Sequence, residues 1–263
     1  MSVRLTRKTW HSTMLNLKAQ IVKAVESGLD WRMLRVGVSS DNMVFIDLDM
    51  TEPYCREKIN EILSTIHRIV GADLFVFGTE RGYHMIPCAV LFNRSIALSS
   101  LEGLKGVEKH KRRRGWTKIV STKWWERRYG ISYPSEYEID AVVDALNKMT
   151  DPRMFWDDAY RAIAYAVPPQ CLDYLHVQVS LQRHYTTLRA VPKPGKPMDI
   201  QFIGLYDGRA VVRMDLERAI AVAKCTKFDD VELANRITQH VRANYPHARL
   251  PQIDALIRFI LGV

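Results

Sequence analysis

The chain has 263 residues, of which 47% are hydrophobic and 25% are charged, and its formal net charge is +9. These values are typical of a globular protein and exclude a chain that is disordered throughout. The sequence has no apolar run of the roughly 18 residues that a membrane helix needs, and residues 1–12 do not lead into an apolar signal-peptide core. We therefore expect an intracellular, cytoplasmic protein that does not associate with membranes.

Helical and extended patterns alternate over the first ninety residues. Apolar residues at helical spacing predict a helix at 13–27, and β-branched and aromatic residues predict a buried strand at 43–49. The next helix ends at Gly71, and two strands follow at 73–78 and 83–88. This strand–helix–strand order favours a parallel pair of strands with a right-handed crossover.

The later part of the chain is mainly helical in pattern. Helices are predicted at 135–149 and 155–166, and an extended segment is predicted at 173–181. A hairpin that turns at Asp207-Gly208 follows. From Asp215 onward, helical patterns fill the last fifty residues.

The four cysteines are scattered along the chain, without a CxxC pair, at Cys55, Cys88, Cys171 and Cys225. This spacing supports neither a zinc knuckle nor a disulfide framework. We therefore expect buried free thiols in a reducing compartment.

Two aspartates, Asp47 and Asp49, lie at the end of the strand predicted at 43–49. Residues i and i+2 of a strand point to the same face, so the two carboxylates repel each other unless a cation lies between them. Mg²⁺ and Mn²⁺ prefer oxygen ligands of this kind and can bind phosphate oxygens at the same time. The pair predicts a divalent metal site, although a DxD sequence also occurs in nucleotide-sugar transferases and by chance in loops.

The segment FVFGTERGYHMI predicts a strand, a tight turn and a second strand that begins near His84. Gly78 and Gly82 allow backbone amides to approach an anion, and Arg81 offers a guanidinium to phosphate. The turn is therefore a candidate binding site for a triphosphate. A plain hairpin with a structural histidine is the alternative interpretation.

Together, FIDLDMTE and FGTERGYH resemble the archaeo-eukaryotic primase superfamily, in which a DxD strand precedes a strand–turn–strand unit with glycine and histidine. The small catalytic primase subunits and the compact stand-alone primase-polymerases are especially similar. The resemblance implies that Asp47 and Asp49 bind metal. It also implies that the incoming nucleotide contacts four residues of the second segment: Thr79, Arg81, Gly82 and His84.

The family also has a third acid, followed by an extended basic stretch. Asp173 in CLDYLH is our candidate for this acid, and Asp199 is the alternative. Arg189, Lys193 and Lys196 would then supply positive charge to the triphosphate. The match is looser here, because the family usually has Ser or His just before the lysine and this chain has neither.

The resemblance implies an α/β fold with a mixed sheet of primase-polymerase type, related to the RNA-recognition fold, with flanking helices. We expect a catalytic domain at 1–214, with a basic insertion at about 105–130, and a C-terminal helical region at 215–263. The zinc module that small primase subunits often carry is missing, so no zinc site is expected.

The segment 105–128 contains ten Lys/Arg against two Glu, a surplus of eight positive charges. Cations interleaved with aromatic rings are typical of surfaces that bind single-stranded nucleic acid. The candidate residues for nucleic-acid binding are Lys109, Lys111, Arg112, Arg113, Arg114, Trp116, Lys118 and Lys123. The alternative is a solvated loop whose tryptophans belong to a core, where at most one of Trp124 and Trp125 would be buried.

The function that we expect is template-dependent nucleotide transfer by two Mg²⁺ or Mn²⁺ ions bound to Asp47, Asp49 and Asp173. Its partners would be single-stranded or primed DNA, nucleoside triphosphates and, in some systems, a second replication subunit. A non-catalytic DNA-binding replication protein that retains the primase fold is the main alternative. A metal enzyme acting on other phosphodiesters or on nucleotide sugars is a third hypothesis.

Overall fold

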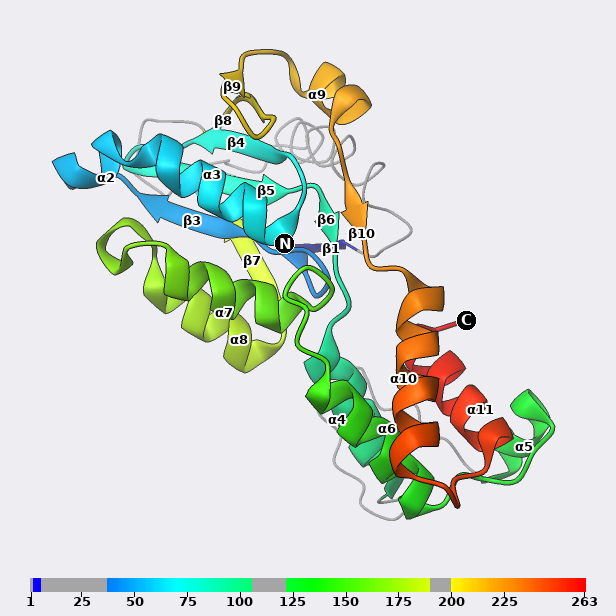
Figure 1. The fold of residues 1–263 in the computed structure, drawn as a ribbon. Helices are drawn as coiled ribbons and strands as arrows, with labels where there is room; N and C mark the ends of the chain where they lie inside the picture. The colour runs from blue at the N-terminus through cyan, green and yellow to red at the C-terminus, as the bar shows by residue number, and fades with distance from the viewer. Residues whose placement is uncertain (1, 6–36, 106–121, 190–199) are drawn as a thin grey trace. The chain divides into compact units, whose positions relative to one another are not determined.

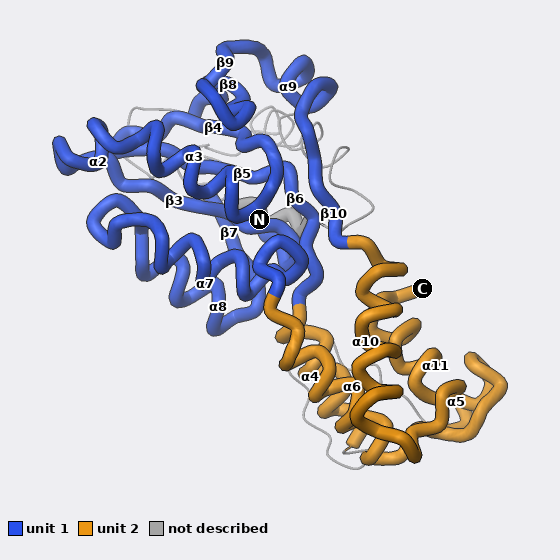
Figure 2. The backbone as a smooth tube through the Cα atoms, viewed as in Figure 1, with its two compact units in different colours: residues 1–93, 151–228 blue, residues 94–150, 229–263 orange. Residues whose placement is uncertain are grey.

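A computed structural model describes residues 2–5, 37–105, 122–189 and 200–263 (Figure 1). The fold is a mixed α/β fold, as expected, and it divides into two compact units (Figure 2). Unit 1 comprises residues 1–93 and 151–228, and unit 2 comprises residues 94–150 and 229–263. Within the described ranges, no helix combines the length and the apolar character needed to cross a membrane.

A five-stranded sheet with the order β3-β5-β4-β8-β9 forms the centre of unit 1. Its strands are β3 (Ile46–Asp49), β4 (Leu74–Gly78), β5 (Gly82–Pro87), β8 (Gln201–Tyr206) and β9 (Val211–Val212). Every neighbouring pair in this sheet is antiparallel. The predicted pairing of β3 with β4 is therefore wrong. The two strands run parallel, but a tight turn folds β5 back between them, so this sheet is antiparallel rather than mixed.

Helix α3 (Ile59–Val70) follows the short helix α2 (Pro53–Glu57) and covers one face of the sheet (Figure 1). The ring of His67 contacts the ring of Tyr206 edge-on, with a centroid distance of 5.8 Å. The helix ends at Gly71, as predicted, and this glycine has a left-handed φ of 66°. Its buried residues have the spacing of one helical face: Ile62, Leu63, Ile66 and Val70.

Helix α7 (Trp156–Ala166) packs beside α3 and is attached to the segment that leads into β3. The indole Nε1 of Trp156 donates a hydrogen bond of 2.8 Å to the carbonyl of Met43. The hydroxyl of Tyr160 accepts from the N–H of Phe45 and donates to its carbonyl. Burial raises the pKa of Tyr160 far above its usual value, so this hydroxyl remains protonated.

After α7, Leu172 forms an isolated antiparallel bridge with Leu48 of β3. The chain therefore runs β3, α3, β4, β5, α7 and then the bridging residue, which is a β–α–β–β–α–β order. In space, the segment with Leu172 lies along the free edge of β3. The order across the sheet is therefore this segment, β3, β5 and β4. This order places the segment that precedes Asp173 beside the strand that carries Asp47 and Asp49.

The segment predicted to be extended at 173–181 is instead part of helix α8 (Tyr174–Arg183). The prediction failed because Asp173 caps the helix: its Oδ1 accepts a 2.9 Å hydrogen bond from the N–H of His176. Val177 and Ser180, three residues apart, are buried on one face. This cap and this packing override the β-propensity of the segment.

A second sheet of unit 1 has the order β1-β2-β7, with β1 parallel to β2 and β2 antiparallel to β7. Its strands are β1 (Ser2–Leu5), β2 (Gly37–Ser40) and β7 (Thr186–Arg189). The predicted hairpin at Asp207-Gly208 is confirmed, since it joins β8 to β9, and Gly208 has a φ of 93°. The helix predicted at 13–27 lies outside the described residues.

All four cysteines form disulfides, so the prediction of free thiols is wrong. Cys55 pairs with Cys171, and Cys88 pairs with Cys225, with Cα–Cα distances of 5.4 and 4.6 Å. Both distances lie in the usual range for a disulfide. The partners are more than 100 residues apart in the chain, so their spacing contains no local sign of the pairing.

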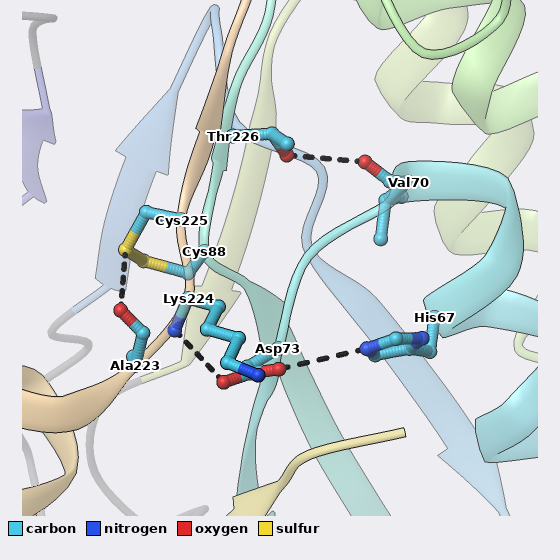
Figure 3. Close-up of a disulfide and its surroundings, with 8 residues drawn as sticks. All are labelled: His67, Val70, Asp73, Cys88, Ala223, Lys224, Cys225 and Thr226. Atoms are coloured by element: carbon cyan, nitrogen blue, oxygen red, sulfur yellow. Dashed lines mark hydrogen bonds and ion pairs between the residues drawn. A yellow bond between two sulfur atoms is a disulfide. The ribbon is translucent and has the colours of Figure 1, made fainter.

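The Cys88–Cys225 disulfide lies beside a buried acid (Figure 3). It crosslinks the chain where β6 (Ala89–Val90) pairs in parallel with β10 (Thr226–Lys227). Asp73 is 3% exposed and accepts a 2.8 Å hydrogen bond from the N–H of Lys224, and its other oxygen lies 3.5 Å from His67 Nε2. These contacts connect the residue before β4 to the segment that leads into β10.

Unit 2 is helical in its described part, which has no strand. Its helices are α4 (Arg94–Lys105), α5 (Thr122–Tyr129), α6 (Glu136–Lys148), α10 (Asp230–Asn244) and α11 (Leu250–Leu261). Helix α6 packs against α4, α10 and α11. The predicted boundary at Asp215 does not coincide with this division, because α9 (Leu216–Val222) belongs to unit 1. The C-terminal helices build a unit with segments from the middle of the chain.

Candidate active site

The paired aspartates project from β3 on the face opposite to α3. Strand residues alternate between faces, so Asp47 and Asp49 share one face while Leu48, which is 1% exposed, points to the other. In the ladder between β3 and β5, Asp47 lies opposite His84, and Asp49 lies opposite Gly82. The Oδ2 atom of Asp47 is 3.5 Å from Nε2 of His84. The two predicted segments therefore meet on one face of the sheet.

The third predicted acid lies on the other side of β3. Because Leu172 bridges Leu48, the antiparallel register places Asp173 opposite Asp47. The N–H of Asp173 donates a 2.9 Å hydrogen bond to the carbonyl of Asp47. The Cα atoms of such a pair are typically about 5.5 Å apart. Asp173, Asp47 and His84 thus form one row across three adjacent backbone segments.

Each carboxylate of the site has a local partner. Oδ1 of Asp49 accepts from the N–H of Thr51, and Oδ1 of Asp173 accepts from the N–H of His176, both at 2.9 Å. The Oδ2 atoms of Asp49 and Asp173 accept no hydrogen bond within the described part of the chain. Two oxygens therefore remain for a ligand next to Asp47, whose side chain is one-third exposed.

The donor set fits a hard divalent cation, since Mg²⁺ and Mn²⁺ prefer carboxylate oxygens. The backbone brings three carboxylates to neighbouring positions, but the side chains do not converge. Among the described residues, no three His, Cys, Asp or Glu side chains are arranged closely enough to bind one metal ion. Asp173 would have to turn from its capping position to share an ion with Asp47.

The β4–β5 hairpin is closed by its own backbone. The N–H of Thr79 donates to the carbonyl of Gly82 (2.9 Å), and the N–H of Gly82 donates to Oγ1 of Thr79 (3.0 Å). These two amides are therefore not free to bind phosphate, which limits the predicted triphosphate site. A Cβ atom at Gly82 would lie 1.9 Å from the carbonyl oxygen of Leu48, so this glycine is required by strand packing.

Other predicted site residues are described only in part or not at all. The backbone of Arg189 pairs with Gly37 in the second sheet. Most of the candidate nucleic-acid-binding residues, two candidate nucleotide-binding lysines and the alternative acid lie outside the described residues: Lys109, Lys111, Arg112, Arg113, Arg114, Trp116, Lys118, Lys193, Lys196 and Asp199.

The end of the basic segment is described, and it contributes to the core of unit 2. Lys123 is exposed on the first turn of α5, while Trp125 is completely buried. The ring of Trp125 packs against Tyr129, with a centroid distance of 4.6 Å, and against Phe259 of α11 at 5.8 Å. As expected, only one of the adjacent tryptophans is buried, since Trp124 is partly exposed.

Sequence reasoning missed the Cys55–Cys171 disulfide, which lies next to the site. In the register set by the Leu48–Leu172 bridge, Cys171 lies opposite Asp49. Cys55 lies on α2, the helix that follows β3, and both cysteines are fully buried. The disulfide therefore attaches the segment that carries Asp173 to the segment that carries Asp49.

Searches of protein-family models, curated proteins and solved structures find no match for this chain. The functional argument therefore rests on the positions and the chemistry of the residues described above.

Proposed function

We propose that the chain is a template-dependent nucleotidyltransferase of the primase or primase-polymerase type, which joins nucleotides during nucleic acid replication. One observation carries this proposal: the register that places Asp173, Asp47 and His84 in a row, with Asp49 on the same face as Asp47. These residues come from three segments far apart in the chain. Acids that serve only solubility have no reason to gather on one sheet face, where they repel each other.

In this proposal, Asp47, Asp49 and Asp173 bind two Mg²⁺ or Mn²⁺ ions. When bound, such ions activate the attacking 3′-hydroxyl and stabilise the pyrophosphate leaving group. His84 is only 9% exposed and approaches Asp47, so it can orient that carboxylate and contact the nucleotide from the same face. Thr79 is hydrogen-bonded to Gly82 at the same end of the sheet, and Gly82 lies opposite Asp49.

The arrangement of unit 1 supports the family assignment that we propose. The β–α–β–β–α–β order, with α3 and α7 packed side by side, is the arrangement expected of a sheet related to the RNA-recognition fold. The acids lie on the face opposite to α3, which leaves that face for substrate.

The proposed partners follow from charge. A surplus of eight positive charges between residues 105 and 128 favours a single-stranded or primed DNA template over a sugar substrate. Nucleoside triphosphates would be the second substrate, and a further replication subunit would be a partner of the same machinery. The proposed location is intracellular, and the two disulfides then favour a hyperthermophilic source, where intracellular disulfides are common.

Nucleotide incorporation tests the proposal. Labelled nucleotides are offered on a single-stranded DNA template with Mg²⁺ or Mn²⁺, with and without a primer, to the wild type and to Asp49→Ala and Asp173→Ala. Glu57→Ala is the matched control, because Glu57 is an exposed acid on α2, the helix that follows β3 in the chain. We expect product from the wild type and the control and none from the other two variants.

Two other outcomes are informative. Loss of product in Asp49→Ala alone would mean that the third acid is not Asp173 but Asp199 or another residue. Absence of product under every condition, with salt-sensitive DNA binding intact, would contradict the proposal and favour a non-catalytic DNA-binding protein.

A further inference from the structure

A pocket of about 350 Å³ lies in unit 1, where the residue before β4, the β8–β9 hairpin and the end of α9 meet. Its volume lies in the range of pockets that bind small molecules. Two acids and two bases contribute to its lining: Asp73, Asp207, Arg209 and Lys224.

The pocket is separate from the candidate active site. Phe77 of β4 pairs with His84, which pairs with Asp47, so this end of β4 belongs to the candidate active site. Asp73 precedes the other end of β4, and the four residues between Asp73 and Phe77 span about 13 Å of a strand. Among the described residues that line the pocket, none is a predicted metal or nucleotide ligand.

Asp73 gives the pocket a buried negative charge. It is 3% exposed, and its Oδ2 accepts a 2.8 Å hydrogen bond from the N–H of Lys224 (Figure 3). Its own N–H donates to the carbonyl of Lys224 at 3.0 Å, which fixes its backbone. Its Oδ1 lies 3.5 Å from Nε2 of His67 and accepts no hydrogen bond from the residues that the structure describes. A buried carboxylate oxygen in this state favours a ligand that carries a cation with N–H donors.

Asp207, on the turn between β8 and β9, gives the pocket a second fixed negative charge. Its Oδ1 accepts from the N–H groups of Ala210 and Arg209, at 3.1 and 2.9 Å. These backbone hydrogen bonds lower the pKa of Asp207, so the carboxylate remains ionised at neutral pH. Both acids are therefore held in place by backbone donors before a ligand binds.

The two bases of the lining are held less firmly. Arg209 and Lys224 are exposed, and their side chains form no ion pair or hydrogen bond with other described residues. They are therefore free to turn toward an anionic group of a ligand. With two acids and two bases the lining has no net charge, which suits a ligand that carries one charge of each sign.

The other walls of the pocket are apolar and contain no aromatic ring: Leu205, Val212, Met214 and Val222. Val212 and Val222 are 43% and 53% exposed, so a ligand would remove apolar surface from water. Walls of this kind match a branched aliphatic group better than a planar base.

We propose that this pocket binds a free zwitterionic amino acid with an aliphatic side chain. Its ammonium group would donate to Asp73, its carboxylate would meet Lys224 and Arg209, and its side chain would lie against the apolar walls. The inference does not depend on the proposed nucleotidyltransferase activity and requires neither a metal ion nor a nucleotide.

Equilibrium dialysis with three related probes tests the inference. L-leucine carries both charges, 3-methylbutylamine lacks the carboxylate, and 4-methylpentanoate lacks the ammonium group. We expect L-leucine to bind most tightly and 4-methylpentanoate most weakly, because the buried Asp73 repels an anion that brings no ammonium group.

Two variants and one control locate the binding. Asp73→Asn keeps an oxygen for the Lys224 N–H but loses the charge, and it should weaken L-leucine binding at least about tenfold. Lys224→Gln keeps its backbone hydrogen bonds and should weaken binding about threefold, as expected for an exposed ion pair. Lys227→Gln, at an exposed lysine of β10 outside the pocket, should bind like the wild type. Urea unfolding of each variant confirms that it is folded.

Three results would overturn the inference. The first is L-leucine binding no tighter than both of its analogues, and the second is wild-type affinity for L-leucine in both folded variants, Asp73→Asn and Lys224→Gln. The third is an equal loss of affinity in Lys227→Gln, since that lysine does not line the pocket.

Discussion

The two units use their acidic side chains in opposite ways. In unit 1, Asp47, Asp49 and Asp173 lie on neighbouring backbone positions, and His84 approaches Asp47 at 3.5 Å. In unit 2, Glu138 is 2% exposed and is matched by Arg249, with Nε–Oε1 and Nη2–Oε2 distances of 2.6 and 3.0 Å.

This difference indicates which acids stabilise the fold and which are available for chemistry. An acid that is buried and fully hydrogen-bonded contributes to the free energy of folding. Neighbouring carboxylates repel each other, so they do not stabilise the fold in this way. Their proximity becomes favourable only when a cation binds between them. The predictions that follow test this contrast.

The largest effect is expected at the paired aspartates. Asp47→Ala should lower incorporation at least about 10³-fold, because a bound metal contributes several kcal/mol to the transition state. The free energy of unfolding should change by less than about 0.5 kcal/mol, since Asp47 is partly exposed and lies among like charges. Urea unfolding and single-turnover kinetics measure the two quantities. A destabilisation above 2 kcal/mol would mean that Asp47 is a structural acid.

The two disulfides should differ in function. Replacing both Cys55 and Cys171 by Ser should cost about 2–5 kcal/mol of stability and should also raise the Mg²⁺ concentration for half-maximal incorporation about tenfold. The reason is that this disulfide attaches the Asp173 segment beside Asp49. The Cys88→Ser/Cys225→Ser variant is the control, with lower stability and unchanged Mg²⁺ dependence. Equal Mg²⁺ dependence in both variants would show that the first disulfide does not position the site.

An intermediate effect is expected at Glu138. Burial acts to raise its pKa, but hydrogen bonds from Arg249 and Ser135 outweigh burial and lower the pKa to about 2. Because folding lowers this pKa, the stabilisation is fully present above about pH 5 and is lost as the pH falls toward 2. Glu138→Gln should therefore lose about 2 kcal/mol at pH 7, which allows for the half-exposed Arg249.

The control for Glu138 is an exposed pair of the same unit. Asp254 and Arg258 are one helical turn apart at 2.9 Å, and both are about 60% exposed. Asp254→Asn should cost only about 0.3–0.5 kcal/mol. Urea unfolding of both variants from pH 3 to 7 checks the contrast. A pH dependence in Glu138→Gln as steep as in the wild type would contradict it.

The smallest effect is expected at Lys123. If this exposed lysine contacts one phosphate, Lys123→Ala should weaken single-stranded DNA binding a few-fold and reduce the salt dependence of log K by about 0.7. Lys148→Ala is a matched control on α6, because Lys148 is also exposed and pairs with Asp144. Fluorescence anisotropy at several salt concentrations measures both. An equal salt dependence of log K in the two variants would show that Lys123 does not contact the DNA.

Local patterns predicted the strands at 43–49, 73–78 and 83–88 and the helices at 135–149 and 155–166, and the observed elements differ from these bounds by one to three residues at their ends. Alternation along a strand was enough to place Asp47 and Asp49 on one face, and the hairpin brought His84 beside them. These features depend on residues that are close together in the sequence, so they can be predicted from one sequence alone.

The features that failed depend on distant contacts. The helix after Asp173 was missed because its cap and its buried face outweigh the β-propensity of Tyr174–Val179. Four cysteines allow three pairings, and their spacing does not choose among them. Unit 2 was missed because α6 packs against helices almost 100 residues later in the chain.

The central claim is that one divalent ion site joins Asp47 and Asp173, and iron-directed cleavage tests it most directly. Fe²⁺ that replaces Mg²⁺ generates hydroxyl radicals with ascorbate and peroxide, and these cut the backbone near the bound ion. We predict cuts at both 46–50 and 171–175, which excess Mg²⁺ suppresses and Asp47→Ala abolishes, while Glu57→Ala keeps them. Cuts at neither segment, or cuts that persist in Asp47→Ala, would contradict the account.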